Sequence, residues 1–119
     1  MTQGFLTTHV LDTSTGSPAA GMKISLYRKE GDKVTHLVDT HTNDDGRTDS
    51  PILPVESFET GRYHLVFHAG AYFEAQGLSL PEPKFLDEVI IAFGLADGSS
   101  HYHVPLLVSP YGYSTYRGS

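Results

Sequence analysis

The sequence contains no cysteine, which excludes a disulfide scaffold, a thiolate nucleophile, Cys-ligated zinc and iron–sulfur clusters. Long hydrophobic runs are also missing, so no segment is long enough to span a bilayer. Positive charge is scarce: 8 Lys and Arg residues stand against 14 Asp and Glu residues, for a formal net charge of -6 at pH 7. Because phosphates bind basic surfaces, we expect neither nucleic acid nor a membrane as partner.

The 119 residues are enough for one hydrophobic core, and we expect residues 1–119 to form a single domain. The N-terminus, MTQGFLTTHV, has neither the positively charged start nor the apolar stretch of a signal peptide. The chain does not end in Ser-Lys-Leu either. These features predict a cytoplasmic protein.

Short segments rich in β-branched and aromatic residues, separated by Gly, Pro, Asn and Asp, predict an all-β sandwich or barrel. We expect the turn-rich stretch 13–21 to lie outside the strand ladder. We expect the one helix at 71–77. The strand 34–42 has few apolar residues, which predicts a place at or near a sheet edge. The expected strands are 6–12, 22–28, 34–42, 62–69, 88–95, 101–109 and a last one after residue 112.

Histidines are the main candidates for chemistry. The sequence holds no G-x-S-x-G elbow, G-x-G-x-x-G or Walker loop, H-E-x-x-H or EF-hand loop. It does hold seven histidines, and imidazole is the side chain best suited to proton exchange near neutral pH. Strand alternation places His9 on the face of Phe5 and Thr7. There His9 is either a solvent-exposed residue or a neutral imidazole held in one tautomer for acid–base work, and His103 has the same two interpretations.

Pairs of histidines on one strand face raise the alternative of a metal site. The pair at 101 and 103 and the pair at 64 and 68 each share a face. Imidazoles suit zinc and copper, but neither pair brings a third ligand in sequence. Surface pairs of histidines are commoner than metal sites, so we interpret five histidines as structural or surface residues: His36, His41, His64, His68 and His101.

Arg47 and the C-terminus are the other candidates. Arg47 follows the turn Asn-Asp-Asp-Gly, and its planar guanidinium suits a carbonyl, enolate or carboxylate oxygen. The alternative for Arg47 is a surface charge. The chain stops at Ser119, soon after the strand-forming residues that end with Tyr116. Such an end either frays or inserts its terminal serine and carboxylate into a neighbouring cavity, most easily across a subunit interface.

Three segments together resemble the transthyretin-like 5-hydroxyisourate hydrolases. They are LTTHVLDTSTGSPAAGMKISLY (6–27), TNDDGR (42–47) and HYHVPLLVSPYGYSTYRGS (101–119), so the resemblance covers essentially the whole chain. The terminal Tyr-Arg-Gly-Ser, and His9 where transthyretin has a lysine, distinguish this family from transthyretin, the thyroid-hormone carrier of the same fold. The resemblance implies a sandwich of two four-stranded antiparallel sheets with one short helix. It also implies a homotetramer with active sites at the dimer–dimer interface.

The resemblance further implies a reaction and its residues. The reaction is hydrolysis of 5-hydroxyisourate to 2-oxo-4-hydroxy-4-carboxy-5-ureidoimidazoline in urate degradation, by His-assisted attack of water on the lactam bond and without a cofactor. The implied catalytic residues are His9, Arg47, His103 and Ser119, and the implied substrate-binding residues are His9, Arg47 and Tyr116. In this hypothesis the two imidazoles share the acid and base roles, and Arg47 stabilises the oxyanion. Two alternatives stay open: a small-ligand carrier and a His-rich metal-binding sandwich.

Overall fold

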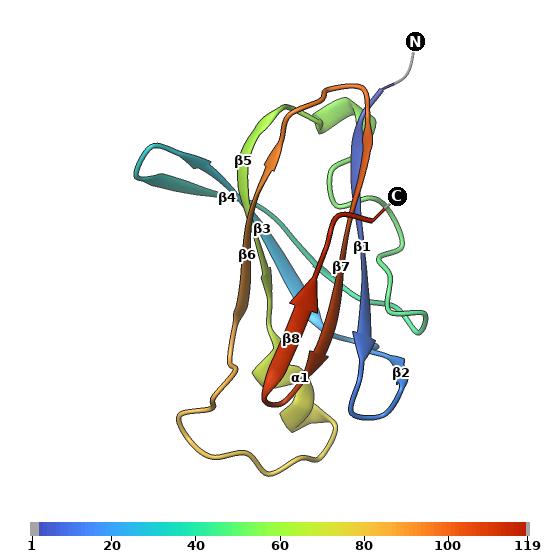
Figure 1. The fold of residues 1–119 in the computed structure, drawn as a ribbon, viewed down its shortest axis with the longest axis vertical. Helices are drawn as coiled ribbons and strands as arrows, with labels where there is room; N and C mark the ends of the chain where they lie inside the picture. The colour runs from blue at the N-terminus through green and yellow to red at the C-terminus, as the bar shows by residue number, and fades with distance from the viewer. Residues whose placement is uncertain (1–2, 119) are drawn as a thin grey trace.

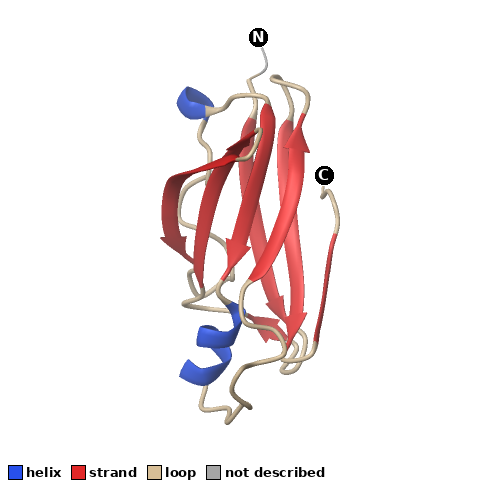
Figure 2. Cartoon of the chain, turned by 90° about the vertical axis from the view of Figure 1, so that its left-hand side faces the viewer, coloured by secondary structure: helices blue, strands red, loops and turns tan. Residues whose placement is uncertain are grey.

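A computed structural model describes residues 3–118. Two four-stranded sheets lie face to face, in the strand orders β2-β1-β7-β8 and β4-β3-β5-β6 (Figure 1). Helix α1 (Ala69–Ala75) lies at one end of the two layers, as the side view in Figure 2 shows. The strands are β1 (Phe5–Asp12), β2 (Ser17–Pro18), β3 (Lys23–Glu30), β4 (Lys33–His41), β5 (Gly61–Phe67), β6 (Val89–Leu95), β7 (His101–Ser109) and β8 (Gly112–Thr115), and a short 3-10 helix covers Val55–Ser57.

The predicted sandwich of two four-stranded sheets with one short helix is confirmed. The strands pair antiparallel with one exception, because β1 and β7 run parallel along their paired length. Helix α1 begins and ends two residues earlier than the predicted 71–77. Strand β4 lies at the edge of its sheet, as its low apolar content predicts.

The prediction that the stretch 13–21 lies outside the ladder was wrong. Ser17 and Pro18 form the two-residue strand β2, which pairs with the end of β1 through Asp12 and Leu11. Proline lacks the backbone N–H that an inner strand must donate, but β2 is the outermost strand of its sheet. A short edge strand therefore tolerates Pro18, although the composition of the stretch indicates a loop.

Alternation along β1 separates the core from the outer surface. Its burial alternates residue by residue: Leu6, Thr8, Val10 and Asp12 are buried between the sheets, and the residues between them face outward. One continuous apolar core fills the space between the two sheets. Its largest fully buried side chains are Tyr63, Phe67, Phe73, Leu6, Met22, Ile24, Leu26, Leu65, Leu95, Leu106, Val10 and Val89.

A buried carboxylate joins α1 to β1. Asp12 is buried, and its Oδ2 accepts a hydrogen bond from the Tyr72 hydroxyl at 2.9 Å. Its Oδ1 accepts bonds from the backbone N–H and the hydroxyl of Ser14 at 2.9 and 2.5 Å. Burial, followed by the hydrogen bond and the charge of Asp12, raises the pKa of Tyr72 to about 12, so this tyrosine stays protonated as a donor. These bonds fix the end of β1, on whose outer face the candidate site lies.

Candidate active site

The outer face of the β1–β7 pair gathers two histidines and a threonine. In the parallel register Thr7 pairs with His103, and Phe5 pairs with His101. Paired residues point to the same side of a sheet, so these four side chains share the outer face. The rings of Phe5 and His101 stack with their centroids 4.0 Å apart and their planes 8° apart, which fixes the orientation of the His101 imidazole.

The Thr7 hydroxyl joins the two imidazoles. Its Oγ1 lies 2.7 Å from His101 Nε2 and 2.8 Å from His103 Nδ1. Both separations are normal hydrogen-bond distances. His103 is half-buried in this arrangement, whereas His101 is exposed. The His103 ring is therefore held by Nδ1, which leaves Nε2 as the ring nitrogen with which it can act on another molecule.

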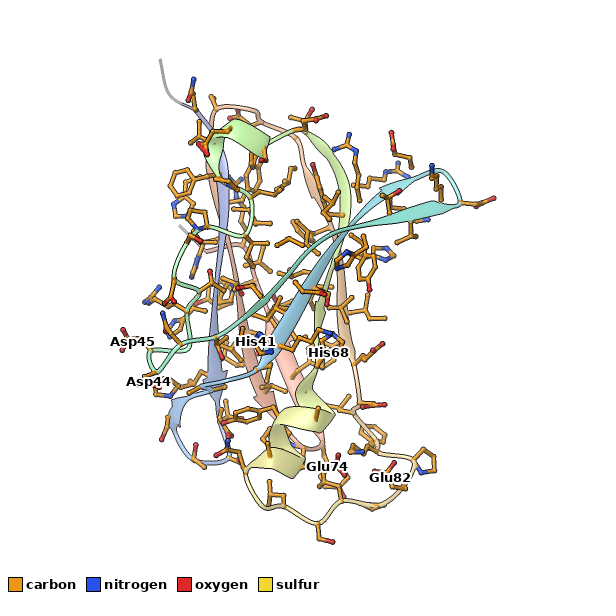
Figure 3. The ribbon with its side chains drawn as sticks, turned by 180° about the vertical axis from the view of Figure 1, so that it is seen from behind. His41, Asp44, Asp45, His68, Glu74 and Glu82 are labelled. Atoms are coloured by element: carbon orange, nitrogen blue, oxygen red, sulfur yellow. The ribbon has the colours of Figure 1, made fainter. Side chains whose placement is uncertain are left out.

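Arg47 reaches the same face from a loop. The turn 43–46 places it there, since Asn43 Oδ1 accepts the backbone N–H groups of Asp45 and Arg47 at 2.9 and 3.2 Å. The tip of this turn, with Asp44 and Asp45, projects from the body of the sandwich in Figure 3. Its other end is fixed to β1 by an isolated antiparallel bridge between His9 and Arg47. The backbone thus places Arg47 beside the outer face of β1.

Gly46 explains how the turn approaches β1 so closely. Its φ is +76°, a left-handed conformation that favours glycine. Its carbonyl accepts the N–H of Val10 at 2.8 Å. A Cβ atom at this position would collide with the carbonyl oxygen of Val10. A glycine directly before Arg47 is therefore a condition for the bridge to His9.

These elements enclose a cleft of about 430 Å3. Burial, and then the positive charge of Arg47 and the neighbouring imidazoles of His101 and His9, lower the pKa of His103. His103 is therefore a neutral imidazole near neutral pH, the form that can accept a proton. The residues that line the cleft are Thr7, Thr8, Arg47, Thr48, Asp49, Ser50, Pro51, His101 and His103.

The terminal segment continues beyond β8 along β7 and reaches His103 of the cleft. The N–H of Gly118 donates to the carbonyl oxygen of His103 at 2.7 Å. The guanidinium of Arg117 lies over the ring of Tyr102, 4.1 Å from its centroid, in a cation–π contact. The two contacts hold Arg117 and Gly118 against β7, next to His103.

The structure brings together three of the five residues implied by the resemblance. His9, Arg47 and His103 share one face, with Arg47 and His103 lining the cleft and His9 bridged to Arg47. Tyr116 is 61% exposed and lines a separate groove of about 280 Å3 beside β6. Ser119 lies outside the described residues.

Two residues of the cleft were missed or misassigned by sequence reasoning. His101 was interpreted as a structural or surface residue, but it lines the cleft and contacts Thr7. Thr7 was not a candidate at all. The two-residue spacing of His101 and His103 was the signal for the shared face, but the parallel pairing that adds Thr7 was not predicted.

Within residues 3–118, no group of three His, Asp or Glu side chains is arranged to hold a metal ion. In the same described part of the chain, no helix has the length and apolar character needed to cross a membrane.

The fold and the cleft define a β-sandwich protein in which the outer face of one sheet carries a cleft lined by an arginine and two histidines. The model of the HIUase/Transthyretin family matches residues 6–118. The chain belongs to this family, which confirms the family predicted from the sequence.

The most informative relatives are bacterial. The chain is 63% identical to 5-hydroxyisourate hydrolase 2 of Rhizobium meliloti, over 98% of this chain and 97% of the relative. It is 58% identical to 5-hydroxyisourate hydrolase of Pseudomonas aeruginosa, over 98% of this chain and 92% of the relative.

Solved structures agree on the fold. The structure of Klebsiella pneumoniae 5-hydroxyisourate hydrolase superposes with a TM-score of 0.81 at 37% identity, over 98% of this chain and 99% of that chain. An (S)-allantoin synthase superposes with a TM-score of 0.90 at 44% identity, over 99% of this chain but only 44% of that longer chain. Sea bream transthyretin in complex with thyroxine gives 0.84 at 28% identity, over 95% of this chain and 93% of that chain.

Proposed function

We propose that the protein hydrolyses 5-hydroxyisourate to 2-oxo-4-hydroxy-4-carboxy-5-ureidoimidazoline in urate degradation. The observation that carries the proposal is the cleft in which a guanidinium and a neutral imidazole, those of Arg47 and His103, face the same space. Hydrolysis of a cyclic amide needs a base for water, a donor for the oxyanion and an acid for the departing nitrogen. The 63% identity to a 5-hydroxyisourate hydrolase supports this substrate.

His9 and His103 share the proton transfers in this mechanism. A neutral imidazole takes a proton from water as the water oxygen adds to the lactam carbonyl carbon. The C–N bond then breaks, and an imidazolium gives its proton to the departing nitrogen. The lowered pKa of His103 supports its role as base, because it keeps Nε2 unprotonated near neutral pH.

Arg47 binds the carbonyl oxygen that becomes the oxyanion. A guanidinium is always charged and offers two parallel N–H donors, so it stabilises negative charge that develops during addition of water. The bridge to His9 and the bonds to Asn43 hold its backbone before substrate arrives. Such preorganisation lowers the barrier, because little reorganisation is left for the reaction itself.

Assembly completes the site in this proposal. We infer a homotetramer with active sites at the dimer–dimer interface, in which Tyr116 positions the substrate ring and Ser119 hydrogen-bonds within the histidine pair. Tyr116 is exposed, and it lines a different groove from the cleft that contains Arg47. Both observations support a role for Tyr116 across an interface. Light scattering on a size-exclusion column tests the tetramer, and cell fractionation tests the cytoplasmic location predicted from the sequence.

The direct test is an ultraviolet assay. Urate oxidase generates 5-hydroxyisourate from urate, and the decay of its absorbance is followed with and without the protein and with excess chelator. We expect accelerated decay that the chelator leaves unchanged. Unaltered decay in the presence of folded protein would refute the proposed function, and loss of the acceleration with chelator would favour the metal-site alternative.

A second candidate function is that of a small-ligand carrier. The likeness to sea bream transthyretin, solved in complex with thyroxine, favours it. Titration calorimetry with thyroxine separates the two functions, since a carrier binds this ligand without turning over 5-hydroxyisourate.

A further inference from the structure

We propose that His103, Thr7 and His101 form a relay that moves the positive charge from His103 to the exposed His101 ring when His103 accepts a proton, and returns it later in the same turnover. The inference rests on the proposed function and assigns roles to two residues outside the implied site. Its basis is one hydroxyl oxygen, Thr7 Oγ1, within 2.8 Å of a nitrogen on each imidazole.

The chemistry of a hydroxyl restricts the protonation of the three groups. Thr7 carries one proton, so it can donate to only one of the two rings, and at least one ring nitrogen must donate to it. When His103 Nδ1–H donates to Thr7 Oγ1, Thr7 can donate to His101 Nε2. In this state His103 Nε2 is an acceptor toward the cleft, as a general base requires.

The reaction makes His103 carry an extra proton for part of each turnover. Water gives a proton to a base as it adds to the lactam carbonyl, and the C–N bond breaks when a proton reaches the departing nitrogen. Between these events a half-buried imidazolium would share the cleft with the guanidinium of Arg47. A route that places this charge on exposed His101 reduces the repulsion.

The relay shuttles one proton in balanced steps. As His103 Nε2 takes a proton from the attacking water, the Nδ1 proton passes to Thr7 Oγ1 and the Thr7 hydroxyl proton passes to His101 Nε2. Exposed His101 then carries the positive charge as an imidazolium. As Nε2 gives its proton up for the departing nitrogen, the same transfers run backward and restore Nδ1–H on His103 and a neutral His101.

The surroundings of the relay favour transfer of the positive charge from His103 to His101. Within residues 3–118, the charged or titratable groups near His103 include Arg47 and Asp49 from the loop, His9 from β1 and His101 from β7. The positive charge of Arg47 opposes a second positive charge on His103. Phe5 keeps the His101 ring stacked at 4.0 Å, in line with Thr7.

Variants separate orientation from proton transfer. Thr7→Val removes the hydroxyl with little change in volume, and Thr7→Ser keeps it. His101→Gln keeps a hydrogen-bonding group near Thr7 but cannot carry a proton. We expect kcat to fall roughly tenfold or more in Thr7→Val and His101→Gln with KM within about twofold, less than the roughly 10²–10⁴-fold contributed by a group that exchanges protons directly with the reactants. Thr7→Ser retains at least about half of kcat, and added imidazole restores activity to His101→Gln.

Matched controls remove the same groups elsewhere. Thr13→Val removes a hydroxyl that binds the carbonyl oxygen of Val108 at the other end of the β1–β7 pair, and His41→Gln removes an imidazole from β4 in the other sheet. Both controls should keep wild-type kcat and pH profile. Normal kcat and pH profile in Thr7→Val and His101→Gln would refute the relay alone, whereas an inactive wild-type protein would refute the proposed function. A slow Thr7→Val beside a normal His101→Gln would also refute the relay.

A measurement on the unaltered protein is independent of activity and of variant folding. Nitrogen-15 NMR distinguishes the two imidazole tautomers. At pH 8 we expect His103 to carry its proton on Nδ1, bound to Thr7, with Nε2 free. A proton on Nε2 alone would overturn the relay.

Discussion

Gly118 lies where a side chain would displace His103. A Cβ atom added to Gly118 would lie 2.6 Å from His103 Cδ2 and 3.2 Å from its Cβ and Cγ. An ordinary contact between such atoms is 3.4–4 Å. Gly118→Ala therefore requires the imidazole or the terminal backbone to move by roughly 1 Å. The movement strains both the bond from Gly118 N–H to the His103 carbonyl and the contact with Thr7.

A displacement of this size affects catalysis more than folding. A misplacement of about 1 Å at a catalytic group can cost on the order of 10²-fold in rate. Overpacking in a well-packed core costs about 1–3 kcal/mol, and the terminal segment has exposed neighbours that can give way. We therefore expect kcat of Gly118→Ala to fall roughly 10²-fold, with a loss in the free energy of unfolding at or below the lower end of that range.

The assay is the ultraviolet decay of 5-hydroxyisourate at saturating substrate, with urea unfolding as the measure of stability. Gly112→Ala is the matched control, because it lies in β8 of the same C-terminal hairpin and its added Cβ would meet only Ser109 Oγ, at 3.8 Å. We expect this control to keep its activity. A Gly118→Ala protein with kcat within about twofold of wild type would refute the reasoning that the terminal segment positions His103.

Three further perturbations test the site and the fold. Arg47→Lys keeps the charge but loses the two-pronged donor, so kcat/KM should fall on the order of 10²-fold in the ultraviolet assay, as for loss of one oxyanion donor; wild-type kcat/KM would contradict the role of Arg47. The lowered pKa of His103 predicts that kcat/KM rises with pH and reaches half its maximum below pH 6.5, the ordinary value for histidine. The same group binds protons more weakly in the folded than in the unfolded chain, so the free energy of unfolding should fall as pH falls below 6.5; a midpoint of the activity profile above 6.5 would contradict this environment for His103. Tyr72→Phe leaves buried Asp12 without its 2.9 Å bond and should lower the free energy of unfolding by about 1–3 kcal/mol in urea, whereas exposed Tyr111→Phe should leave it unchanged; equal stabilities would show that the buried bond contributes little.

Most of the fold follows from local patterns in the sequence. The alternation in β1 predicts the strand and its two faces, and the turn residues around it predict its ends to within one or two residues. The parallel pairing of β1 with β7 joins residues 96 positions apart, and no local pattern specifies it. The prediction for Ser17 and Pro18 was wrong for a related reason, because their strand exists only through its pairing with β1.

The residues of the candidate site were also predictable only where they carry a local signal in the sequence. His9, Arg47 and His103 each carry a local signal: an imidazole on a strand face, or a guanidinium after a tight turn. Thr7 carries none, since a threonine in a strand is ordinary, and its importance comes from the register that puts it opposite His103. His101 was visible as the neighbour of His103, but only the 2.7 Å contact with Thr7 gives it a role.

The two-residue period of β1 also explains how a small chain holds a polar site without weakening its core. Successive side chains alternate between the space inside the sandwich and the outer face, so Leu6 and Val10 are fully buried while Thr7 and His9 lie on the outer face. A one-residue slip in register would bury the imidazole and expose the leucine, which the apolar core strongly opposes. The same burial that stabilises the fold therefore fixes the positions of the groups that exchange protons, and a variant that changes an outward residue of β1 should alter activity with little effect on the core.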